Sequence, residues 1–309
     1  IRKNYETAVQ MNEMTQPVIS VKNLTQRYGN GRVIYSDLSF DVPEGRILGL
    51  LGKNGTGKTT TINILMGYLR PQRGECRIFG EPITEMAPST RARIALLIEG
   101  HVQYSFMTIE QIERFYSRFY PRWNRDAYYE LMRKLKVSPN QKISSMSCGQ
   151  RSQVALGLIL AQNADLLVLD DFSLGLDPGY RRLFVDYLRE FAKSENKTVF
   201  MTSHIIQDME RLIDDCIILD YGKILIQSPV DKLMNDFSRY TFVADEGTEV
   251  PADPKFINPG RIGSHVELYT FQSLEYVKEA IERQGIGYSD LRRCDMSLED
   301  AFIGLTGKY

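Results

Sequence analysis

The chain has 309 residues, long enough for about two domains, and its 38 basic and 39 acidic residues leave a net charge of −1. This balance excludes the overall basic signal of a nucleic-acid binder or of a protein held on an anionic membrane. No apolar run in the sequence approaches the ~20 residues that would cross a bilayer. The four cysteines have the spacing of neither a metal site nor a disulfide scaffold, so we expect a reducing, cytosolic setting.

The amino-terminal part of the chain predicts an extension followed by a β-rich sheet. Residues 1–16 are polar without clear periodicity, and we expect them to be mobile or foreign to the protein. Residues 18–29 and 33–52 alternate apolar and polar side chains between Gly, Asn and Pro, which is typical of strands and turns. Residues 58–69 repeat apolar side chains at helical spacing, so a helix should follow the strand at 46–51.

The middle of the chain alternates helices and buried strands. Residues 108–137 predict an all-helical insertion that begins with Thr108 and Gln111 as a capping box. The other expected elements are a helix at 149–162, buried strands at 165–171 and 197–204, and a hairpin at 216–227 that turns at Tyr221–Gly222. Strands that alternate with helices favour a parallel sheet covered on both faces.

The composition of the sequence changes near Asn235, where a polar linker with Pro and Gly precedes a small α+β segment. No internal repeat is found, which excludes a tandem duplication. The predicted organisation is an extension at 1–16, a main domain at 17–235 with a helical subdomain at about 100–150, and an accessory α+β domain at 236–309.

Residues 52–59, "GKNGTGKT", have the spacing G-x-x-x-x-G-K-[ST] and stand between a predicted strand and a predicted helix. Backbone N–H groups of such a loop and the helix amino end attract phosphate, while the lysine reaches the outer phosphates and the hydroxyl holds Mg²⁺. The fold class is therefore predicted as an α/β phosphate-loop NTPase. The expected nucleotide-binding residues of this segment are Asn54, Gly55, Thr56, Gly57, Lys58, Thr59 and Thr60.

Two adjacent carboxylates, Asp170 and Asp171, follow an apolar run at residues 166–169. In phosphate-loop proteins a carboxylate that ends a neighbouring buried strand reaches the magnesium ion, and Asp170 is placed for that role. A second carboxylate is useful if it orients or deprotonates the attacking water, and we expect Asp171 to do this.

From about Val18 to Tyr309 the chain resembles the nucleotide-binding subunit of ABC transporters, because further motifs follow in that family's order. Residues 146–150, "MSCGQ", resemble the signature L-S-G-G-Q, and residues 173–178, "SLGLDP", resemble the D-loop. The resemblance implies adenine stacking by Tyr28, the Q-loop position at Glu99, binding of a second subunit's nucleotide by Ser147, Gly149 and Gln150, a D-loop contact by Asp177 and a switch histidine at His204.

The resemblance also implies the chemistry of the site. The substrate would be ATP with Mg²⁺, and Thr59, Glu99 and Asp170 would hold the metal. Asp171, His204 and Glu99 would be the catalytic groups. Each single residue keeps a structural interpretation as well: Tyr28 as an ordinary hairpin residue, His204 as a core histidine and Ser147 as a helix N-cap. The motif context favours the nucleotide roles, and we expect Ser147 to have both.

Three residues depart from the family pattern: Asp171 stands in place of glutamate, Glu99 in place of glutamine, and Cys148 in place of the first signature glycine. The first change shortens the arm of the predicted base by one methylene, about 1.5 Å. A misplacement of about 1 Å costs on the order of a hundredfold in rate. We therefore expect an enzyme with slow intrinsic hydrolysis.

The segments "SLEDAFIGLTG" and "RFYPRWNRD" are similar to those of ATPases that energise exporters of drugs, antibiotic peptides or polysaccharides. The implied partners are an integral membrane permease and a second ATPase subunit, in a homodimer or a heterodimer, with no nucleic acid. The implied location is peripheral, on the cytoplasmic face of the plasma membrane. A regulatory switch protein that binds ATP with little or no turnover is the alternative that Asp171 leaves open.

Two other classes of protein fit the sequence less well. ABC proteins that act on ribosomes or DNA usually carry two phosphate loops or a long coiled coil, and this chain has one loop and no sustained heptads. A GTPase would need Asn-Lys-x-Asp to read guanine, but Asn196-Lys197 is followed by Thr198-Val199.

Overall fold

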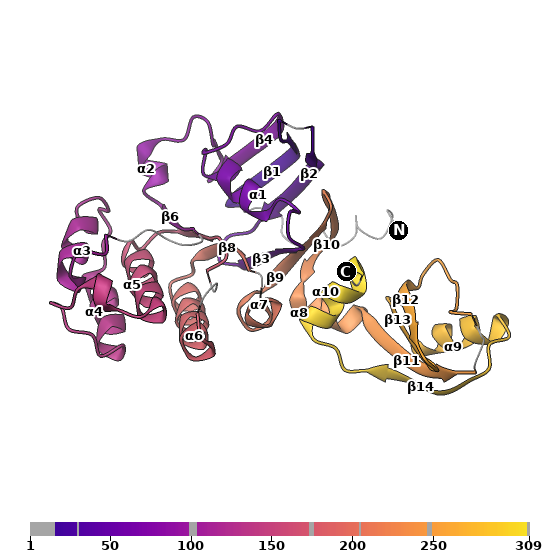
Figure 1. The fold of residues 1–309 in the computed structure, drawn as a ribbon. Helices are drawn as coiled ribbons and strands as arrows, with labels where there is room; N and C mark the ends of the chain where they lie inside the picture. The colour runs from indigo at the N-terminus through magenta and orange to yellow at the C-terminus, as the bar shows by residue number, and fades with distance from the viewer. Residues whose placement is uncertain are drawn as a thin grey trace.

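The computed structural model describes residues 16–29, 31–98, 104–172, 176–203, 205–245 and 249–307. These residues form three sheets: the first lies above the central sheet in Figure 1, and the third lies at the lower right, near the yellow carboxyl-terminal helix. The predicted amino-terminal extension lies outside the described residues, except for its last residue.

The first sheet is antiparallel and has the strand order β2-β1-β4-β5. The predicted strands at its start are confirmed, whereas β4 and β5 were not predicted. Apolar residues of β1 and β2 alternate with polar ones. One face of the sheet therefore packs in a hydrophobic core that includes Val21, Phe40 and Ile64. The strands are β1 (Ile19–Arg27), β2 (Val33–Val42), β4 (Arg73–Ile78) and β5 (Glu81–Pro82).

The central sheet has the order β10-β9-β3-β8-β7-β6. All neighbouring pairs from β9 to β6 are parallel, and only β10 is antiparallel, as a hairpin with β9. The α/β prediction and the hairpin are thus confirmed. Every residue of β7 and β8 is buried. The strands are β3 (Ile47–Gly52), β6 (Ile94–Leu97), β7 (Leu166–Leu169), β8 (Thr198–Thr202), β9 (Asp215–Asp220) and β10 (Lys223–Pro229).

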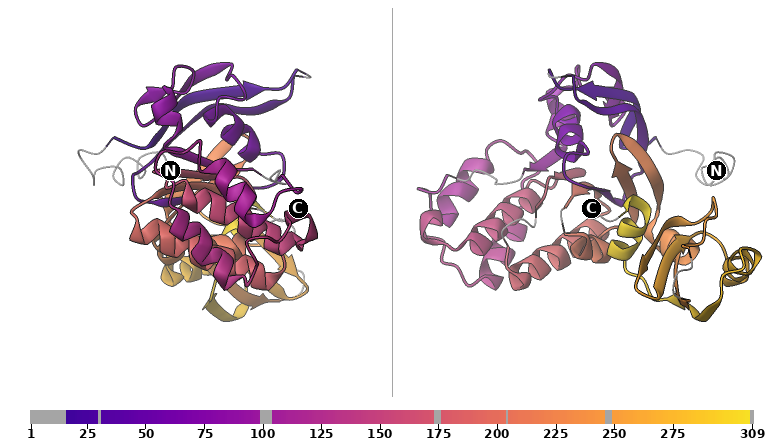
Figure 2. Two further views of the ribbon diagram at one scale, coloured as in Figure 1. Left: turned by 90° about the vertical axis from the view of Figure 1, so that its left-hand side faces the viewer. Right: turned by 45° about the vertical axis from the view of Figure 1, so that its right-hand side comes forward.

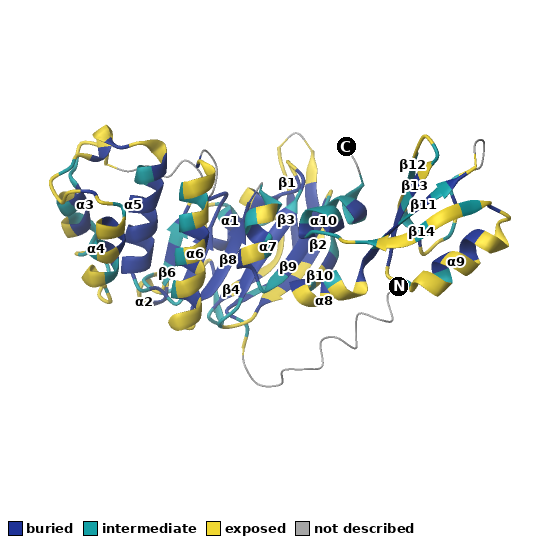
Figure 3. Ribbon diagram, turned by 90° about the horizontal axis from the view of Figure 1, so that it is seen from below, coloured by how far each residue is buried: buried dark blue, intermediate teal, exposed yellow. Residues whose placement is uncertain are grey.

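Helices cover this sheet, and those on the left of Figure 1 form a group of their own around the buried α5 (Figure 3). The helices before the accessory sheet are α1 (Lys58–Leu65), α2 (Pro88–Arg91), α3 (Ile109–Tyr116), α4 (Arg125–Lys134), α5 (Cys148–Ala161), α6 (Pro178–Ser194), α7 (Ile206–Leu212) and α8 (Val230–Asp236).

The helical insertion predicted at 108–137 is confirmed, and it consists of two helices, α3 and α4. Its capping box of Thr108 and Gln111 is confirmed. Pro121 cannot continue a helix, and the Asn124 side chain accepts a hydrogen bond from the Ala127 amide to start α4.

One carboxylate, Asp165, ties this helical group to the sheet. Asp165 accepts hydrogen bonds from Arg93, which precedes β6, at 2.6 Å, and from Arg122, in the connection between α3 and α4, at 2.8 Å. Burial raises the pKa of the Asp165 carboxyl, but the two guanidinium groups outweigh it and hold the pKa below its usual value.

Because this pKa is depressed, the stabilisation is present above the usual aspartate pKa and is lost as the pH falls through the depressed one. We expect Asp165→Asn to lower the free energy of unfolding by roughly 0.5–1 kcal/mol at neutral pH, and the difference should close in acid. Urea unfolding of both chains across that pH range measures it. Asp186→Asn removes an exposed carboxylate paired with Arg182 at 3.6 Å and should change little at any pH.

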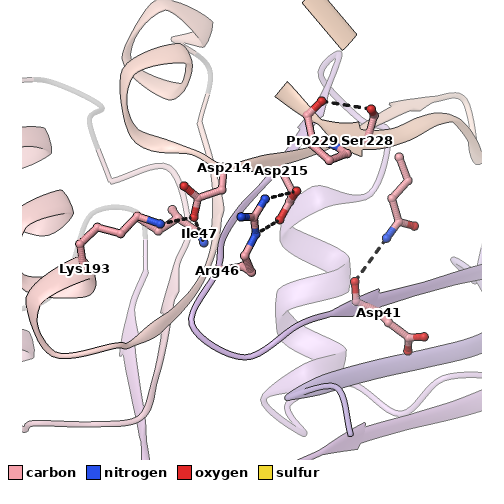
Figure 4. Close-up of polar contacts among 9 residues, drawn as sticks. Asp41, Arg46, Ile47, Lys193, Asp214, Asp215, Ser228 and Pro229 are labelled. Atoms are coloured by element: carbon pink, nitrogen blue, oxygen red, sulfur yellow. Dashed lines mark hydrogen bonds and ion pairs between the residues drawn. The ribbon is translucent and has the colours of Figure 1, made fainter. Parts of the chain in front are cut away.

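The start of β3 is fixed by two neighbouring carboxylates at the start of β9 (Figure 4). The Arg46 guanidinium forms a bidentate pair with Asp215, with both distances 2.7 Å, and this hydrogen bonding raises the pKa of Arg46. Asp214 accepts from the Ile47 amide at 2.9 Å and pairs with Lys193 of α6 at 2.6 Å. The strand that leads into the phosphate loop is therefore anchored at its opposite end.

The third sheet is antiparallel, with the order β12-β13-β11-β14, and α9 covers one of its faces. It has a hydrophobic core of its own, in which Phe242, Leu268 and Ile281 are fully buried. The last helix, α10, lies between this sheet and the central sheet (Figure 2). The elements are β11 (Ser238–Ala244), β12 (Ile257–Ile262), β13 (His265–Thr270), α9 (Leu274–Arg283), β14 (Tyr288–Cys294) and α10 (Leu298–Thr306).

Candidate nucleotide site

Several of the residues with predicted chemistry gather at one edge of the central sheet. Because β3, β8 and β7 are parallel neighbours, their carboxyl ends meet at the same edge. The phosphate loop follows β3, Asp170 and Asp171 follow β7, and Thr202 ends β8. The fold therefore brings together segments that lie more than a hundred residues apart.

The phosphate loop turns tightly from β3 into α1. Gly57 has φ +103°, a conformation that favours glycine, and a Cβ there would lie 2.5 Å from an Ile34 methyl group. The Lys58 ammonium donates to the carbonyl oxygens of Gly52 at 2.7 Å and Lys53 at 3.1 Å. Thr56 is buried and donates to the Lys53 carbonyl at 2.8 Å. Lys58 is thus hydrogen-bonded to the main chain at the start of its own loop.

The charge of Lys58 is poorly solvated. Burial lowers the pKa of its ammonium, and the carboxylates of Asp171 and Asp170 oppose that shift. A buried cation at a helix amino end, with few water molecules to screen it, attracts an anion more strongly than an exposed lysine does. The loop and Lys58 together form a site suited to phosphate.

Thr202 organises the two aspartates. Its hydroxyl donates to Asp170 Oδ1 at 2.7 Å and accepts from the Asp171 amide at 3.1 Å. Thr59, the hydroxyl residue of the phosphate loop, lies 3.4 Å from the same Asp170 oxygen. Asp171 has φ +47°, so the backbone turns sharply directly after Asp170. Both aspartates are buried.

These oxygens fit a magnesium ion. Mg²⁺ prefers oxygen ligands and is usually bound by one or two carboxylates together with substrate phosphates and water. Thr59 and Asp170 offer such a pair at the mouth of the phosphate loop. In the described part of the chain no group of three His, Cys, Asp or Glu side chains is arranged to hold a metal, so the phosphates themselves would have to complete the coordination.

Tyr28 directly follows β1 and lies beside the start of α1, next to the phosphate loop. Its hydroxyl lies 2.9 Å from the Thr60 hydroxyl, in α1. The side chain is 47 % exposed, which leaves aromatic surface open to a flat ligand. The structure therefore brings the predicted adenine contact next to the predicted phosphate loop, and the stacking itself stays a prediction.

The signature segment caps α5. The Ser147 hydroxyl accepts from the Gln150 amide at 3.2 Å, and Gln150 accepts from the Ser147 amide at 3.1 Å, so the structural role of Ser147 is confirmed. The helix begins at Cys148, one residue before the predicted start, and Cys148 is exposed. Gly149 is required here because a Cβ would lie 2.3 Å from the Tyr180 ring. Asp177 caps α6 through the amides of Gly179 and Tyr180.

The signature segment and the phosphate loop are not joined within the chain. In the residues that the structure describes, no hydrogen bond links Ser147, Gly149 or Gln150 to the loop, and α5 packs instead with α4 and α6. Two predicted residues, Glu99 and His204, lie outside the described residues. Their roles stay predictions.

Two residues of the site were not anticipated from the sequence. No role was predicted for Thr202, although a polar residue at the end of an apolar strand is a local signal of a functional position. Lys53 donates to the carbonyls of Thr306 and Gly307, and a contact between residues 253 positions apart leaves no local signal at all.

A groove of about 450 Å³ is lined by residues of β6, of the helices α3 and α5, and of the end of α1. Burial raises the pKa of Tyr116 and Tyr120, two of the tyrosines in its wall. The Gln162 side-chain oxygen, also in the wall, is buried and has no hydrogen-bond partner among the residues that the structure describes. The lining includes Tyr68, Arg91, Ile98, Tyr116, Tyr120 and Gln162.

Comparisons with known proteins agree with this geometry. The family described as "ABC transporter" matches residues 35–173. The chain is 29 % identical over 311 residues to the Nod factor export ATP-binding protein I of Ralstonia nicotianae, covering 94 % of each chain. It is 29 % identical over 299 residues to the bacitracin transport ATP-binding protein BcrA of Bacillus licheniformis, covering 94 % of this chain and 97 % of the relative.

Solved structures show the same fold. An ATP-binding subunit of an ABC transporter superposes with a TM-score of 0.62 and 25 % identity, over 71 % of this chain and 92 % of that chain. In the described residues, no helix is long and apolar enough to cross a membrane. Because the relatives match along nearly the whole chain and the family match contains both the phosphate loop and the paired aspartates, the chain belongs to the ABC transporter ATP-binding proteins and is an ATPase of that family.

Proposed function

We propose that the chain is the ATP-hydrolysing subunit of an ABC exporter and drives a separate membrane permease. The observation that carries the catalytic part is the meeting of Lys58, Thr59 and the two aspartates at one sheet edge, with Thr202 bonded to both aspartates. Export is supported by relatives that are named for Nod factor export and bacitracin transport. The transported substrate would be recognised by the permease.

In this proposal the loop from Asn54 to Thr60 binds the phosphates of ATP, and Tyr28 stacks on the adenine. Lys58 exchanges its two carbonyl acceptors for phosphate oxygens, which carry full negative charge and bind an ammonium more strongly. Thr59 and Asp170, with Glu99, hold Mg²⁺, which neutralises charge on the transferring phosphoryl group. Thr202 fixes the rotamer of Asp170 for that purpose.

Asp171 and His204 are proposed to act at the terminal phosphate. Asp171 orients or deprotonates the attacking water, and His204 contacts the phosphate. The aspartate arm is one methylene shorter than the glutamate of the family pattern, so the water is held less well and hydrolysis is slow.

The second half of the site would come from another subunit. Ser147, Gly149 and Gln150 begin α5, whose amino end carries partial positive charge and is exposed at Ser147 and Cys148. Since no hydrogen bond among the described residues joins them to the phosphate loop of their own chain, we propose that they lie, with Asp177, against the nucleotide of a partner subunit. Two ATP molecules would then be enclosed between two chains, identical or different.

The groove beside β6 is proposed to receive a helix of the permease. Tyr68 and Ile98 are exposed apolar residues in its wall, and apolar surface of this kind is covered by a partner. The buried oxygen of Gln162 needs a donor from that helix, and Arg91 favours an acidic residue on it. The chain would be peripheral, on the cytoplasmic face of the membrane.

Detergent extraction followed by affinity purification of the tagged chain tests this function. We expect an integral membrane protein to copurify with it, and the reconstituted pair to hydrolyse ATP. Gln162→Leu should weaken the copurification without changing ATP binding. A chain that binds ATP but brings down no membrane protein, and does not hydrolyse ATP, would instead be the regulatory switch that Asp171 leaves open.

A further inference from the structure

The end of α10 is bonded to the phosphate loop. The Lys53 ammonium donates to the carbonyl oxygens of Thr306 and Gly307, both at 3.0 Å. The last carbonyls of a helix have no partner within the helix and carry partial negative charge, so a cation complements them. Lys53 is only 8 % exposed, which makes these charge-assisted hydrogen bonds strong.

The main chain of Lys53 faces the catalytic side of the loop. Its carbonyl accepts from the Lys58 ammonium at 3.1 Å and from the Thr56 hydroxyl at 2.8 Å. A single residue therefore connects α10, through its side chain, with the lysine that is proposed to bind the phosphates.

Helix α10 also contacts the elements on both of its other sides. Gln207 of α7, the helix after β8, donates to Glu299 at 3.0 Å. Asn258 of β12 donates to the Gly304 carbonyl at 2.8 Å. Figure 2 shows α10 wedged between the accessory sheet and the central sheet. It thus touches the phosphate loop, the helix that leaves the sheet edge, and the accessory sheet.

We propose that Lys53 and α10 form a strut that couples nucleotide binding at the phosphate loop to the packing of the accessory domain. Lys53 is a positioning residue: it holds the loop in place through α10, behind the carbonyl that Lys58 uses. The expected effect of Lys53 on ATP affinity rests on the proposed function. The restraint that Lys53 places on the phosphate loop does not depend on that function. Coupling of this kind is reciprocal, so ATP must change α10 as much as α10 changes ATP affinity.

Hydrogen exchange of the full chain, followed by mass spectrometry with and without Mg·ATP, tests the strut. In the wild type, ATP should change the exchange of residues 298–307 as well as of the loop. Lys53→Met keeps the aliphatic stem and removes the donor. In that variant α10 should no longer respond to ATP, and the dissociation constant for ATP should rise about five- to tenfold. Lys53→Arg retains a donor and should restore part of the response.

Loss of charge near the phosphates needs a separate control. Arg32 is a second cation at the same loop, 3.5 Å from the Gly55 carbonyl. Arg32→Met should weaken ATP binding without removing the response of α10. The proposal is overturned if α10 of Lys53→Met responds to ATP as the wild type does.

A wild type that binds no ATP would defeat the proposed function rather than the strut. The strut is then judged without nucleotide. Lys53→Met should increase the exchange of both the loop and the last turn of α10, and unchanged exchange in both segments would reject it.

Discussion

Replacing Lys58 by alanine should lower ATP turnover by at least about a hundredfold, the loss typical of removing one preorganised electrostatic contact. It should also weaken ATP binding. The reason is that Lys58 is buried at the start of α1, where burial lowers the pKa of its ammonium and weakens the screening of its charge. Phosphate release and titration of the pure chain with Mg·ATP measure the two effects.

The matched control for Lys58→Ala is Lys197→Ala. Lys197 is another lysine that is almost completely buried, and burial lowers its pKa too, but it donates to Asn163 at 2.7 Å. Its removal should cost stability and leave ATP affinity unchanged. Thermal melts of both variants separate unfolding from loss of the site, because Lys58→Ala also removes one hydrogen-bond donor from each of the Gly52 and Lys53 carbonyls. An ATP affinity of Lys58→Ala within twofold of the wild type would contradict the proposal.

The phosphate loop could be predicted from the sequence because its determinants are local. Gly57 must adopt a positive φ, Lys58 and Thr59 must follow at once, and an apolar strand must precede them. The paired aspartates are local in the same sense, since they directly follow buried β7. What made the two segments neighbours was the parallel order of strands, which the alternation of strands and helices already favoured.

The rest of the site depends on contacts between distant segments. Gly149 matches a motif letter, but its physical requirement is the Tyr180 ring of the next helix, which no pattern around residue 149 contains. The contact between Lys53 and α10 likewise joins residues that lie 253 positions apart in the sequence. The break between α3 and α4 is different in kind: Pro121 was a readable local signal, and the apolar spacing on either side of it obscured the break.

Asp171→Glu should accelerate single-turnover ATP hydrolysis, by up to about a hundredfold, because the longer arm brings the carboxylate about 1.5 Å nearer to the water. Asp171 has φ +47°, a conformation that aspartate tolerates better than most residues. The glutamate variant should therefore lose up to about 1 kcal/mol of stability even as its rate rises. Rapid-quench assays at saturating Mg·ATP, with urea unfolding alongside, measure the two effects.

The neutral isostere Asp171→Asn tests whether the Asp171 carboxylate activates the attacking water at all. It keeps the size of the side chain, and its backbone amide still bonds to Thr202, so a change in rate reports the carboxylate alone. If Asp171 activates water from too far away, the rates should rise in the order Asn, Asp, Glu. Equal rates for Asp and Glu would remove the idea that arm length limits hydrolysis. Equal rates for Asp and Asn, with ATP still bound, would mean that this carboxylate activates no water, and the chain would then act as a switch set by ATP binding.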